Sequence, residues 1–211
     1  MRIWVRILIV FVLTLSSFSW TAVSFGEDRF VQVRWVDDGD TIVLSDGTRV
    51  RYVGINAPEV AHKNKPAEPF GPEAREVNRK LVYKKTVRLE FDREKHDQYG
   101  RVLAYVYLKD GKFVNGDLVS SGHAYFVFRE PNTKHDSRLL ALQREAMTKR
   151  VGLWATLSDQ GGPFLGNRRS KRFHQMDCPF GNQTRSRNRE IFTTKYNAFW
   201  KGYSPCKKCL R

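Results

Sequence analysis

Short runs of alternating apolar and polar residues dominate the first half of the chain. Alternation at period two is typical of a β-strand with one buried face, and short continuous apolar runs are typical of strands buried on both faces. Turns rich in aspartate and glycine separate these runs, at Asp37–Asp40 and at Ser45–Gly47. The pattern predicts five strands, at residues 30–36, 41–44, 48–55, 86–91 and 102–108.

Helical periodicity enters after the third and fifth strands. Pro72 suits the first turn of a helix, and Ala74 and Leu81 belong to its apolar face. A short helix is predicted at 114–121 and an amphipathic one at 139–147. The predicted order is three strands, a helix, two strands and then further helices. This is the order of a five-stranded OB-fold barrel. The predicted fold class is therefore mainly β with appended helices (α+β), followed by a small C-terminal module.

The chain begins with a segment typical of export. Arg2 and Arg6 precede an apolar run and a small-residue cleavage site, which predicts a secretory signal peptide over residues 1–24. An uncleaved membrane anchor is the alternative. The working part is expected to be secreted or periplasmic, without stable membrane association if the signal is cleaved. The remaining divisions are predicted to be a barrel domain at 27–158, a basic linker at 159–172 and a C-terminal module at 173–211.

Basic charge is concentrated at the end of the chain. The 211 residues carry a formal net charge of +15. Residues 25–166 hold 23 Lys+Arg and 20 Asp+Glu, whereas residues 167–211 hold 12 Lys+Arg and 2 Asp+Glu. Such an excess favours a polyanionic partner, either nucleic acid or an anionic membrane surface.

Candidate chemistry gathers between Val36 and Glu59. Asp38 and Asp40 flank a glycine, Arg51 lies on the third predicted strand, and Glu59 follows a proline. Carboxylates suit a hard cation, and a guanidinium suits bidentate phosphate binding. Ordinary turn residues, an exposed strand arginine and a solvated glutamate are the alternative interpretation. We hypothesise a metal-dependent phosphodiesterase.

A second polar island lies at residues 97–101 (DQYGR), between two apolar strands. A hairpin loop is the plain interpretation. In the functional interpretation Arg101 joins Arg51 at one phosphate, and two arginines would stabilise the charge that develops on phosphorus.

With these pieces in order, residues 30–155 resemble the thermonuclease (staphylococcal nuclease) family of Ca²⁺-dependent OB-fold nucleases. The resemblance rests on the ordered motifs at 38–41 (DGDT), 51–59 (RYVGINAPE), 71–74 (GPEA), 97–106 (DQYGRVLAYV), 114–115 and 118–119. It implies hydrolysis of DNA and RNA phosphodiester bonds to 3′-phosphate products. DNA and RNA are the implied partners, and we expect a monomer.

The resemblance also implies a calcium site. Asp40 would be the first carboxylate ligand, Asn56 stands where the family usually has a second, and Ala57 would bind through its backbone carbonyl. Asn56 keeps an oxygen but removes a full negative charge, so weaker Ca²⁺ binding is expected. Extracellular calcium modules work at weak affinities of roughly 10⁻⁴–10⁻³ M, which makes this tolerable after export.

Roles for other residues follow from the same resemblance. Glu59 would orient or deprotonate the attacking water, while Arg51 and Arg101 would hold the scissile phosphate. Substrate contacts are implied for four further residues, namely Tyr99, Gln98, Phe126 and Phe128. Gln98 and Phe126 depart from residues common in the family, which alters substrate contacts and leaves the chemistry intact.

The C-terminal module carries all three cysteines of the chain. His174, Cys178, Cys206 and Cys209 form an H-x₃-C…C-x₂-C pattern that fits tetrahedral zinc, and so short a module needs such a staple. A Cys206–Cys209 disulfide with Cys178 free is the alternative. The surrounding residues resemble the zinc-binding domain of the Ada-type alkylation-repair protein. There a cysteine accepts a methyl group; here that position is His174, so a structural zinc is expected.

The sequence therefore predicts a calcium-dependent nuclease with a structural zinc. Two alternatives remain: a catalytically weak nucleic-acid-binding barrel, and a DNA-damage recognition protein that acts through the zinc module.

Overall fold

The computed structural model describes residues 29–62, 65–157 and 161–210 of the chain. The expected signal peptide at 1–24 lies outside the described residues. No helix in the described ranges is both long enough and apolar enough to span a membrane.

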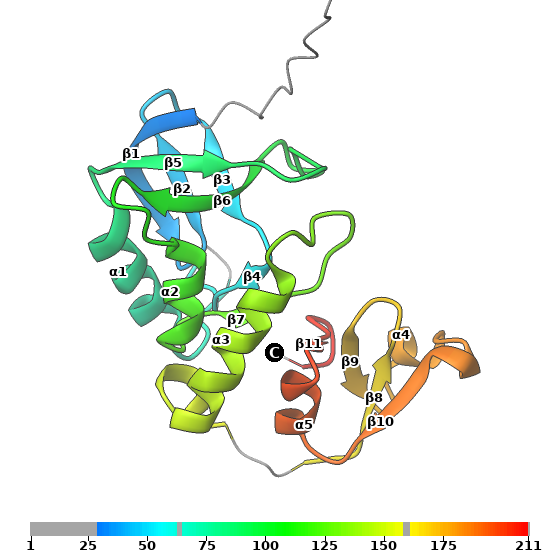
Figure 1. Ribbon diagram of the computed structural model, residues 1–211. Coiled ribbons are helices and arrows are strands. Elements are labelled where there is room, and N and C mark those ends of the chain that lie inside the picture. The colour runs from blue at the N-terminus through cyan, green and yellow to red at the C-terminus, as the bar shows by residue number, and fades with distance from the viewer. Residues whose placement is uncertain (1–28, 63–64, 158–160, 211) are drawn as a thin grey trace, which may run out of the picture.

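Five strands close into a barrel, as predicted (Figure 1). Their order around the barrel is β1-β2-β3-β6-β5, with β3 and β6 parallel and the other neighbours antiparallel. The strands are β1 (Arg29–Asp38), β2 (Thr41–Leu44), β3 (Arg49–Tyr52), β5 (Thr86–Glu90) and β6 (Val102–Leu108). Pairing of β1 with β5 leaves this sheet without a free edge.

Side-chain alternation explains why these strands form. Val87 and Leu89 of β5 are buried while their neighbours are partly exposed. The middle of β6, from Leu103 to Tyr107, is buried throughout, as its continuous apolar run predicts. The inner side chains of all five strands meet in one apolar core.

The third strand ends earlier than predicted. It stops at Tyr52, and Gly54 takes a left-handed conformation with φ of +75°. A Cβ on Gly54 would lie 2.6 Å from Leu139 Cδ1, so only glycine fits there. The chain turns at this point, and β4 (Ile55–Asn56) pairs with β7 (Tyr125–Phe126) in a separate two-stranded sheet. Asn56 is therefore held beside Tyr125 and not in the barrel wall.

Three helices cover the barrel, close to the predicted positions. They are α1 (Gly71–Val82), α2 (Val114–Ser120) and α3 (Asp136–Lys149), followed by a short turn of 3₁₀-helix, η1 (Gly152–Trp154). Helix α1 packs on β1, and α2 packs against α3. Helix α3 begins three residues before the predicted start at 139.

The C-terminal module begins earlier than predicted. Its four-stranded sheet has the order β10-β8-β9-β11. The strands are β8 (Phe164–Asn167), β9 (Arg172–Gln175), β10 (Arg189–Phe192) and β11 (Ser204–Pro205), with α4 (Pro179–Asn182), η2 (Ser186–Asn188) and α5 (Lys195–Trp200) between them. The stretch 159–172, predicted to be a linker, thus contains β8 and the first residue of β9. Phe164 and Leu165 are buried, and residues 168–171, three of which are basic, form the turn between the two strands.

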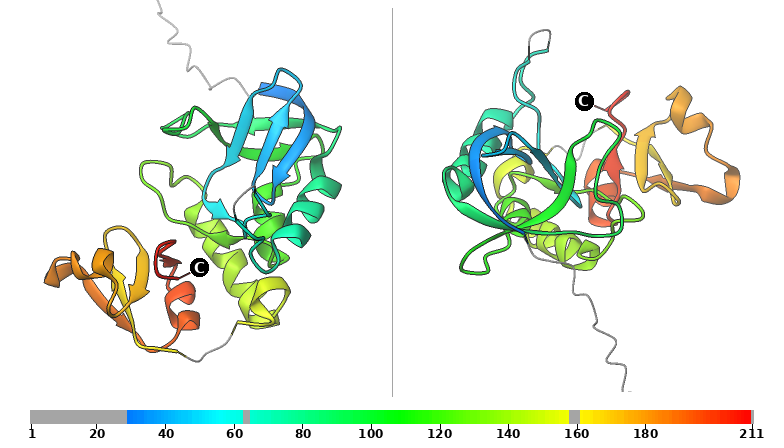
Figure 2. Two further views of the ribbon diagram at one scale, coloured as in Figure 1. Left: turned by 180° about the vertical axis from the view of Figure 1, so that it is seen from behind. Right: turned by 90° about the horizontal axis from the view of Figure 1, so that it is seen from above.

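The module packs on the barrel domain through α3 and α5 (Figures 1 and 2). Met147 and Trp154 of the barrel domain share an apolar cluster with Phe173 and Phe199 of the module. Gln143 is fully buried at this junction; its Oε1 accepts a hydrogen bond from the Phe126 N–H at 2.7 Å, and its Nε2 donates to the Phe199 carbonyl at 2.7 Å. A shared core of this kind fixes the module relative to the barrel.

Candidate active site

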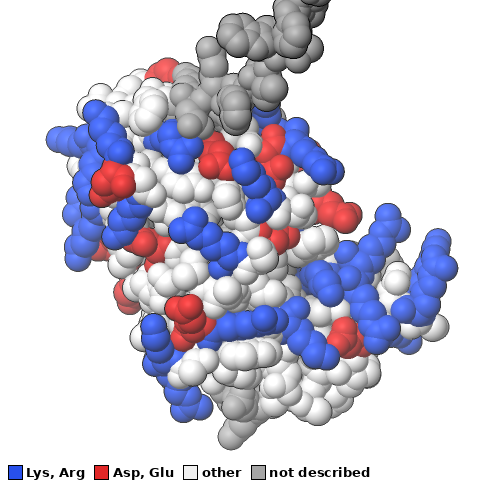
Figure 3. Space-filling model, in the orientation of Figure 1, with Lys and Arg blue, Asp and Glu red and all other residues white. Residues whose placement is uncertain are grey.

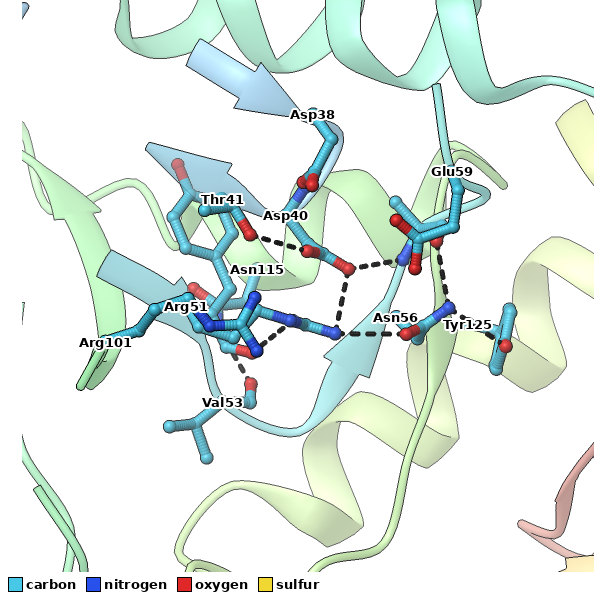
Figure 4. Close-up of polar contacts among 12 residues, drawn as sticks. Asp38, Asp40, Thr41, Arg51, Val53, Asn56, Glu59, Arg101, Asn115 and Tyr125 are labelled. Atoms are coloured by element: carbon cyan, nitrogen blue, oxygen red, sulfur yellow. Dashed lines mark hydrogen bonds and ion pairs between the residues drawn. The ribbon is translucent and has the colours of Figure 1, made fainter. Parts of the chain in front are cut away.

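One pocket brings together half of the ten residues predicted for catalysis, calcium binding and substrate contact. Asp40, Arg51, Asn56, Glu59 and Arg101 all line it. They come from the β1–β2 turn, β3, β4, the segment after β4 and the start of β6 (Figure 4). The pocket is also lined by residues that were not predicted, namely Val127, Arg129, Asn132, Arg172 and Lys207.

Asp40 is the buried carboxylate of this pocket. Its Oδ1 accepts a hydrogen bond from the Thr41 hydroxyl at 3.1 Å, and its Oδ2 accepts one from the Ala57 N–H at 2.7 Å. Burial raises the pKa of Asp40 to about 7, against the opposing effect of Arg51. The neighbouring Asp38 accepts a hydrogen bond from the Asp40 N–H at 2.9 Å, so it shapes the turn.

Gly39 allows Asp40 to sit this deep. A Cβ at position 39 would lie 2.5 Å from the Ala57 Cβ and 2.8 Å from the Ala74 Cβ of α1. The Asp-Gly-Asp motif is therefore both a turn and the close contact that places a carboxylate on the pocket floor.

Arg51 joins the two predicted side-chain calcium ligands. Its Nη2 lies 2.9 Å from Asp40 Oδ2 and 3.1 Å from Asn56 Oδ1, and its Nη1 donates to the Tyr52 carbonyl at 2.7 Å. The two oxygens thus converge on one cationic atom, as ligands of a single metal ion would. Oxygen donors around a desolvated carboxylate are the set that a hard cation prefers, so these residues fit Ca²⁺.

The amide of Asn56 has a second set of contacts. Its Nδ2 donates to the Ala57 carbonyl at 2.9 Å and to the Tyr125 hydroxyl at 3.0 Å. The Ala57 carbonyl, predicted to bind calcium, therefore lies beside Asn56 and keeps one lone pair available. Tyr125 was not predicted; its partner on β4 becomes visible only once β4 and β7 are paired.

Glu59 is held by a residue from the far end of the chain. Its Oε1 lies 2.9 Å from Lys207 Nζ, and their side chains are 40% and 49% exposed. Burial works to raise the pKa of Glu59, but the hydrogen bond and the charge of Lys207 outweigh it and leave the pKa lowered. The predicted base is thus an ionised carboxylate at the rim of the pocket.

Arg101 borders the main pocket and two neighbouring depressions. Its Nε donates to Asp97 Oδ2 at 2.8 Å, which fixes the guanidinium. Arg101 also lines an open depression beside Tyr99, whose side chain is 74% exposed and whose ring centroid lies 5.7 Å from the Arg101 Cζ. Gln98 is exposed on the same loop. Tyr99 and Gln98 therefore lie outside the main pocket, next to a residue that lines it.

The predicted roles of Phe126 and Phe128 are not supported by their positions. Phe126 is buried in the barrel core, and Phe128 packs against that core. Val127 and Arg129 line the pocket instead. Contact of Phe126 and Phe128 with substrate stays a prediction, and neither residue lines this pocket.

Comparison with known proteins agrees with this geometry. The family model described as "Staphylococcal nuclease homologue" matches residues 49–156. The thermonuclease of Staphylococcus intermedius is 42% identical over 125 residues, which cover 58% of this chain and 74% of the relative. The chain belongs to the staphylococcal nuclease family. The thermonuclease of Staphylococcus hyicus is 34% identical over 141 residues (65% of this chain, 83% of the relative), and the endonuclease YncB of Bacillus subtilis is 38% identical over 123 residues (56% and 58%).

The staphylococcal nuclease match ends before the C-terminal module, whose predicted metal ligands do come together. The ligand atoms of His174, Cys178, Cys206 and Cys209 all lie within 4.8 Å of one another, and Cys178 Sγ is 3.5 Å from His174 Nδ1. Ligand bonds of about 2.0–2.3 Å place the corners of a tetrahedron about 3.5–3.8 Å apart, so the cluster has the size of a zinc site. All three cysteines are free thiols in the structure, which favours the metal site over a Cys206–Cys209 disulfide.

The backbone around Cys178 also favours a metal-bound thiolate. Burial works to raise the pKa of the Cys178 thiol, but hydrogen bonds from the N–H of Gly181, the Cys209 thiol and the N–H of Phe180 leave it lowered. A thiolate is the form that binds zinc. The cluster therefore supplies four suitable ligands from β9, the start of α4 and the segment after β11.

Proposed function

We propose that this protein is a calcium-dependent nuclease that acts after export and cleaves DNA and RNA to 3′-phosphate products. The observation that carries the proposal is the convergence of a buried carboxylate, two arginines and a glutamate on one pocket in a member of the staphylococcal nuclease family: Asp40, Arg51, Arg101 and Glu59. Export rests on the sequence of residues 1–24 alone.

The residues of the pocket fit in-line hydrolysis. Glu59 accepts a proton from a water as its oxygen attacks phosphorus. Arg51 and Arg101 bind the non-bridging oxygens, whose charge grows in the pentacoordinate transition state. The bond from phosphorus to the 5′ oxygen breaks, and that oxygen takes a proton from solvent. One strand then ends in a 3′-phosphate and the other in a 5′-hydroxyl.

Asp40, Asn56 and the Ala57 carbonyl would hold the calcium ion. When bound, Ca²⁺ supplies positive charge to the phosphate oxygens and favours ionisation of a bound water. Arg51 contacts both Asp40 and Asn56, so phosphate binding by Arg51 and metal binding by the two ligands share one network. Because Asp40 would be the one carboxylate that binds the ion directly, the affinity for Ca²⁺ should lie in the weak range of extracellular calcium modules.

Zinc has a structural role in this proposal. His174 offers an imidazole and not a thiolate nucleophile, and the cluster lies within a module too short to fold on a core of its own. The basic residues of the C-terminal module, seen at the right of Figure 3, would bind the phosphates of nucleic acid.

The test compares hydrolysis of single-stranded DNA with and without added Ca²⁺. We expect Glu59→Gln to reduce kcat by about 10²–10⁴-fold, the usual contribution of a general base. The exposed glutamate of α1 provides a matched control, because Glu73→Gln removes the same charge away from the pocket. Product masses should show 3′-phosphate ends.

A binding protein is the second candidate, favoured by the missing charge at Asn56 and by the engagement of Glu59 with Lys207. Strand binding without Ca²⁺-dependent cleavage by wild type would select it and reject the nuclease.

A further inference from the structure

The active-site pocket is not built by the barrel alone. Arg172, the first residue of β9, and Lys207, in the turn between Cys206 and Cys209, line the same pocket as Arg51 and Glu59. Both belong to the C-terminal module, which the family match at 49–156 does not include. The module therefore contributes two positive charges to the pocket where phosphodiester chemistry is proposed.

Arg172 is a cation that lacks a carboxylate partner within the described part of the chain. Among the described residues, its side chain makes one hydrogen bond, from Nη1 to the Pro205 carbonyl at 3.4 Å. The side chains of Arg129 and Arg51 line the same pocket as Arg172. Several guanidinium groups beside one another are unfavourable unless an anion lies between them. This arrangement is suited to bind a phosphate group.

Lys207 is placed for the same anion. Its ammonium lies 2.9 Å from the Glu59 carboxylate, so it already contacts an anionic oxygen at the pocket rim. A phosphate oxygen would replace that carboxylate as its partner and leave Glu59 available to a water. Because Lys207 lies between two cluster cysteines, the predicted metal site holds the backbone that carries it.

The module is packed firmly enough to position these groups. Phe173, next to Arg172, and Phe199 share a core with Met147 and Trp154 of the barrel domain. Gln143 ties the two parts together through buried hydrogen bonds on either side. The two cations are thus fixed relative to Arg51 by a core and not by surface contacts alone.

We propose that Arg172 and Lys207, with Arg129 beside them, form a second phosphate subsite that binds a phosphate next to the scissile one. This rests on the proposed function, since it assigns the scissile phosphate to Arg51 and Arg101. The chemical class of the ligand is a single-stranded nucleic acid with at least two phosphates. The module then favours longer strands over substrates with one phosphodiester.

The experiment uses the full-length protein with its metal cluster intact. Ca²⁺-dependent cleavage is measured on a thymidine dinucleoside monophosphate, which has one phosphate, and on an octathymidylate. We expect Arg172→Met and Lys207→Met each to raise KM for the octamer about 10-fold, the effect of one charge-assisted hydrogen bond, and to leave KM for the dinucleotide within about twofold.

Matched controls are available outside the module. Lys80→Met and Lys109→Met each remove an exposed positive charge from the barrel domain, and neither position lines the pocket. Both should retain wild-type KM for the octamer. Lys207→Arg and Arg172→Lys keep the charge and should recover part of the lost binding. Zinc content equal to wild type shows that each variant is folded.

Binding separates this proposal from the proposed nuclease activity. Octamer affinity is measured against salt in calcium-free buffer without chelator, where strands are not cleaved. Each methionine variant should reduce the slope of log K against log salt by about 0.7, the release of one counterion from a single strand. If wild type cleaves the octamer while KM and the salt slope are unchanged in both methionine variants, the subsite is overturned and the nuclease activity stands. Absence of cleavage with a reduced slope overturns the nuclease and supports the subsite. Higher kcat on both substrates for Lys207→Met, with KM unchanged, identifies an inhibitory contact and overturns the subsite.

Discussion

Lys207 and Glu59 are 148 residues apart in the chain, yet their charged groups meet at 2.9 Å. This pair joins the C-terminal module to the residue best placed to act as general base. The contact means that the module and the barrel make one active-site pocket. A barrel expressed without the module would lose the partner of Glu59 and the positive charge of Arg172 together.

Calcium affinity should depend on the charge at position 56. We expect Asn56→Asp to lower the Ca²⁺ concentration that gives half-maximal activity by about 10-fold, because ligand charge tunes calcium affinity. The new carboxylate accepts a hydrogen bond from Tyr125, whereas the Asn56 amide donates one. Calcium titration of activity checks this, with Tyr125→Phe as the control for the altered hydrogen bond. An unchanged half-saturation point would show that Asn56 is not a ligand.

Metal loss should unfold the module. We expect one zinc per chain by elemental analysis, and we expect Cys209→Ser to lose that zinc and lower the melting temperature. Structural zinc contributes directly to folding in small modules, and this one shares its core with α3. Met176→Ala, an exposed change near the cluster, should keep the metal. A native mass about 2 Da below the reduced mass, with no zinc, would instead identify a disulfide.

The buried amide at the junction should contribute to stability. Replacement of Gln143 by methionine keeps the volume but leaves the buried Phe126 N–H without its acceptor, while the Phe199 carbonyl keeps its bond from the Gly202 N–H. The free energy of unfolding in urea should fall by about 1–3 kcal/mol. Arg144→Met removes an exposed bond to the Trp200 carbonyl across the same junction and should cost less. Equal losses would contradict a special role for Gln143.

Asp136 should make stability depend on pH. Its Oδ1 is buried without a hydrogen-bond partner among the described residues, and burial, with Asp92 nearby, raises its pKa from 3.8 to about 6. The folded state disfavours the charged form, so the penalty is absent below pH 3.8 and complete above about pH 6. Asp136→Asn should therefore melt at a higher temperature than wild type at pH 8, and the gain should shrink as the pH falls from 6 to 4. Glu73→Gln, an exposed carboxylate in the first turn of α1, should show no such gain.

Local patterns of apolar and polar residues were enough to predict the strands of the barrel. Val87 and Leu89 alternate with polar neighbours, and the run from Leu103 to Tyr107 is apolar throughout, so strand positions followed from the sequence. Gly54 was the exception. The apolar residues on either side of it continue the strand pattern, whereas in the structure Gly54 has a left-handed backbone conformation and packs closely against Leu139.

The pocket was predicted where one motif holds several of the residues that line it. Asp40, Arg51 and Glu59 lie in one short stretch, and Arg101 lies in a polar island at the start of a buried strand. Val127 and Arg129 were missed as lining residues, because the pairing of β7 with β4 next to them is not specified by any local pattern.

The sequence by itself determined the barrel, the family, the four residues of the Cys/His cluster and several of the residues that line the pocket. Each follows from short-range periodicity or from residues close together in the chain. Only the tertiary structure decided that Arg172 and Lys207 reach the pocket and that β8 belongs to the module and not to a linker. Contacts between distant segments depend on how the module packs on the barrel domain. The packing of Phe173 and Phe199 against Met147 and Trp154 produces no periodic pattern in the sequence, so local patterns do not predict it.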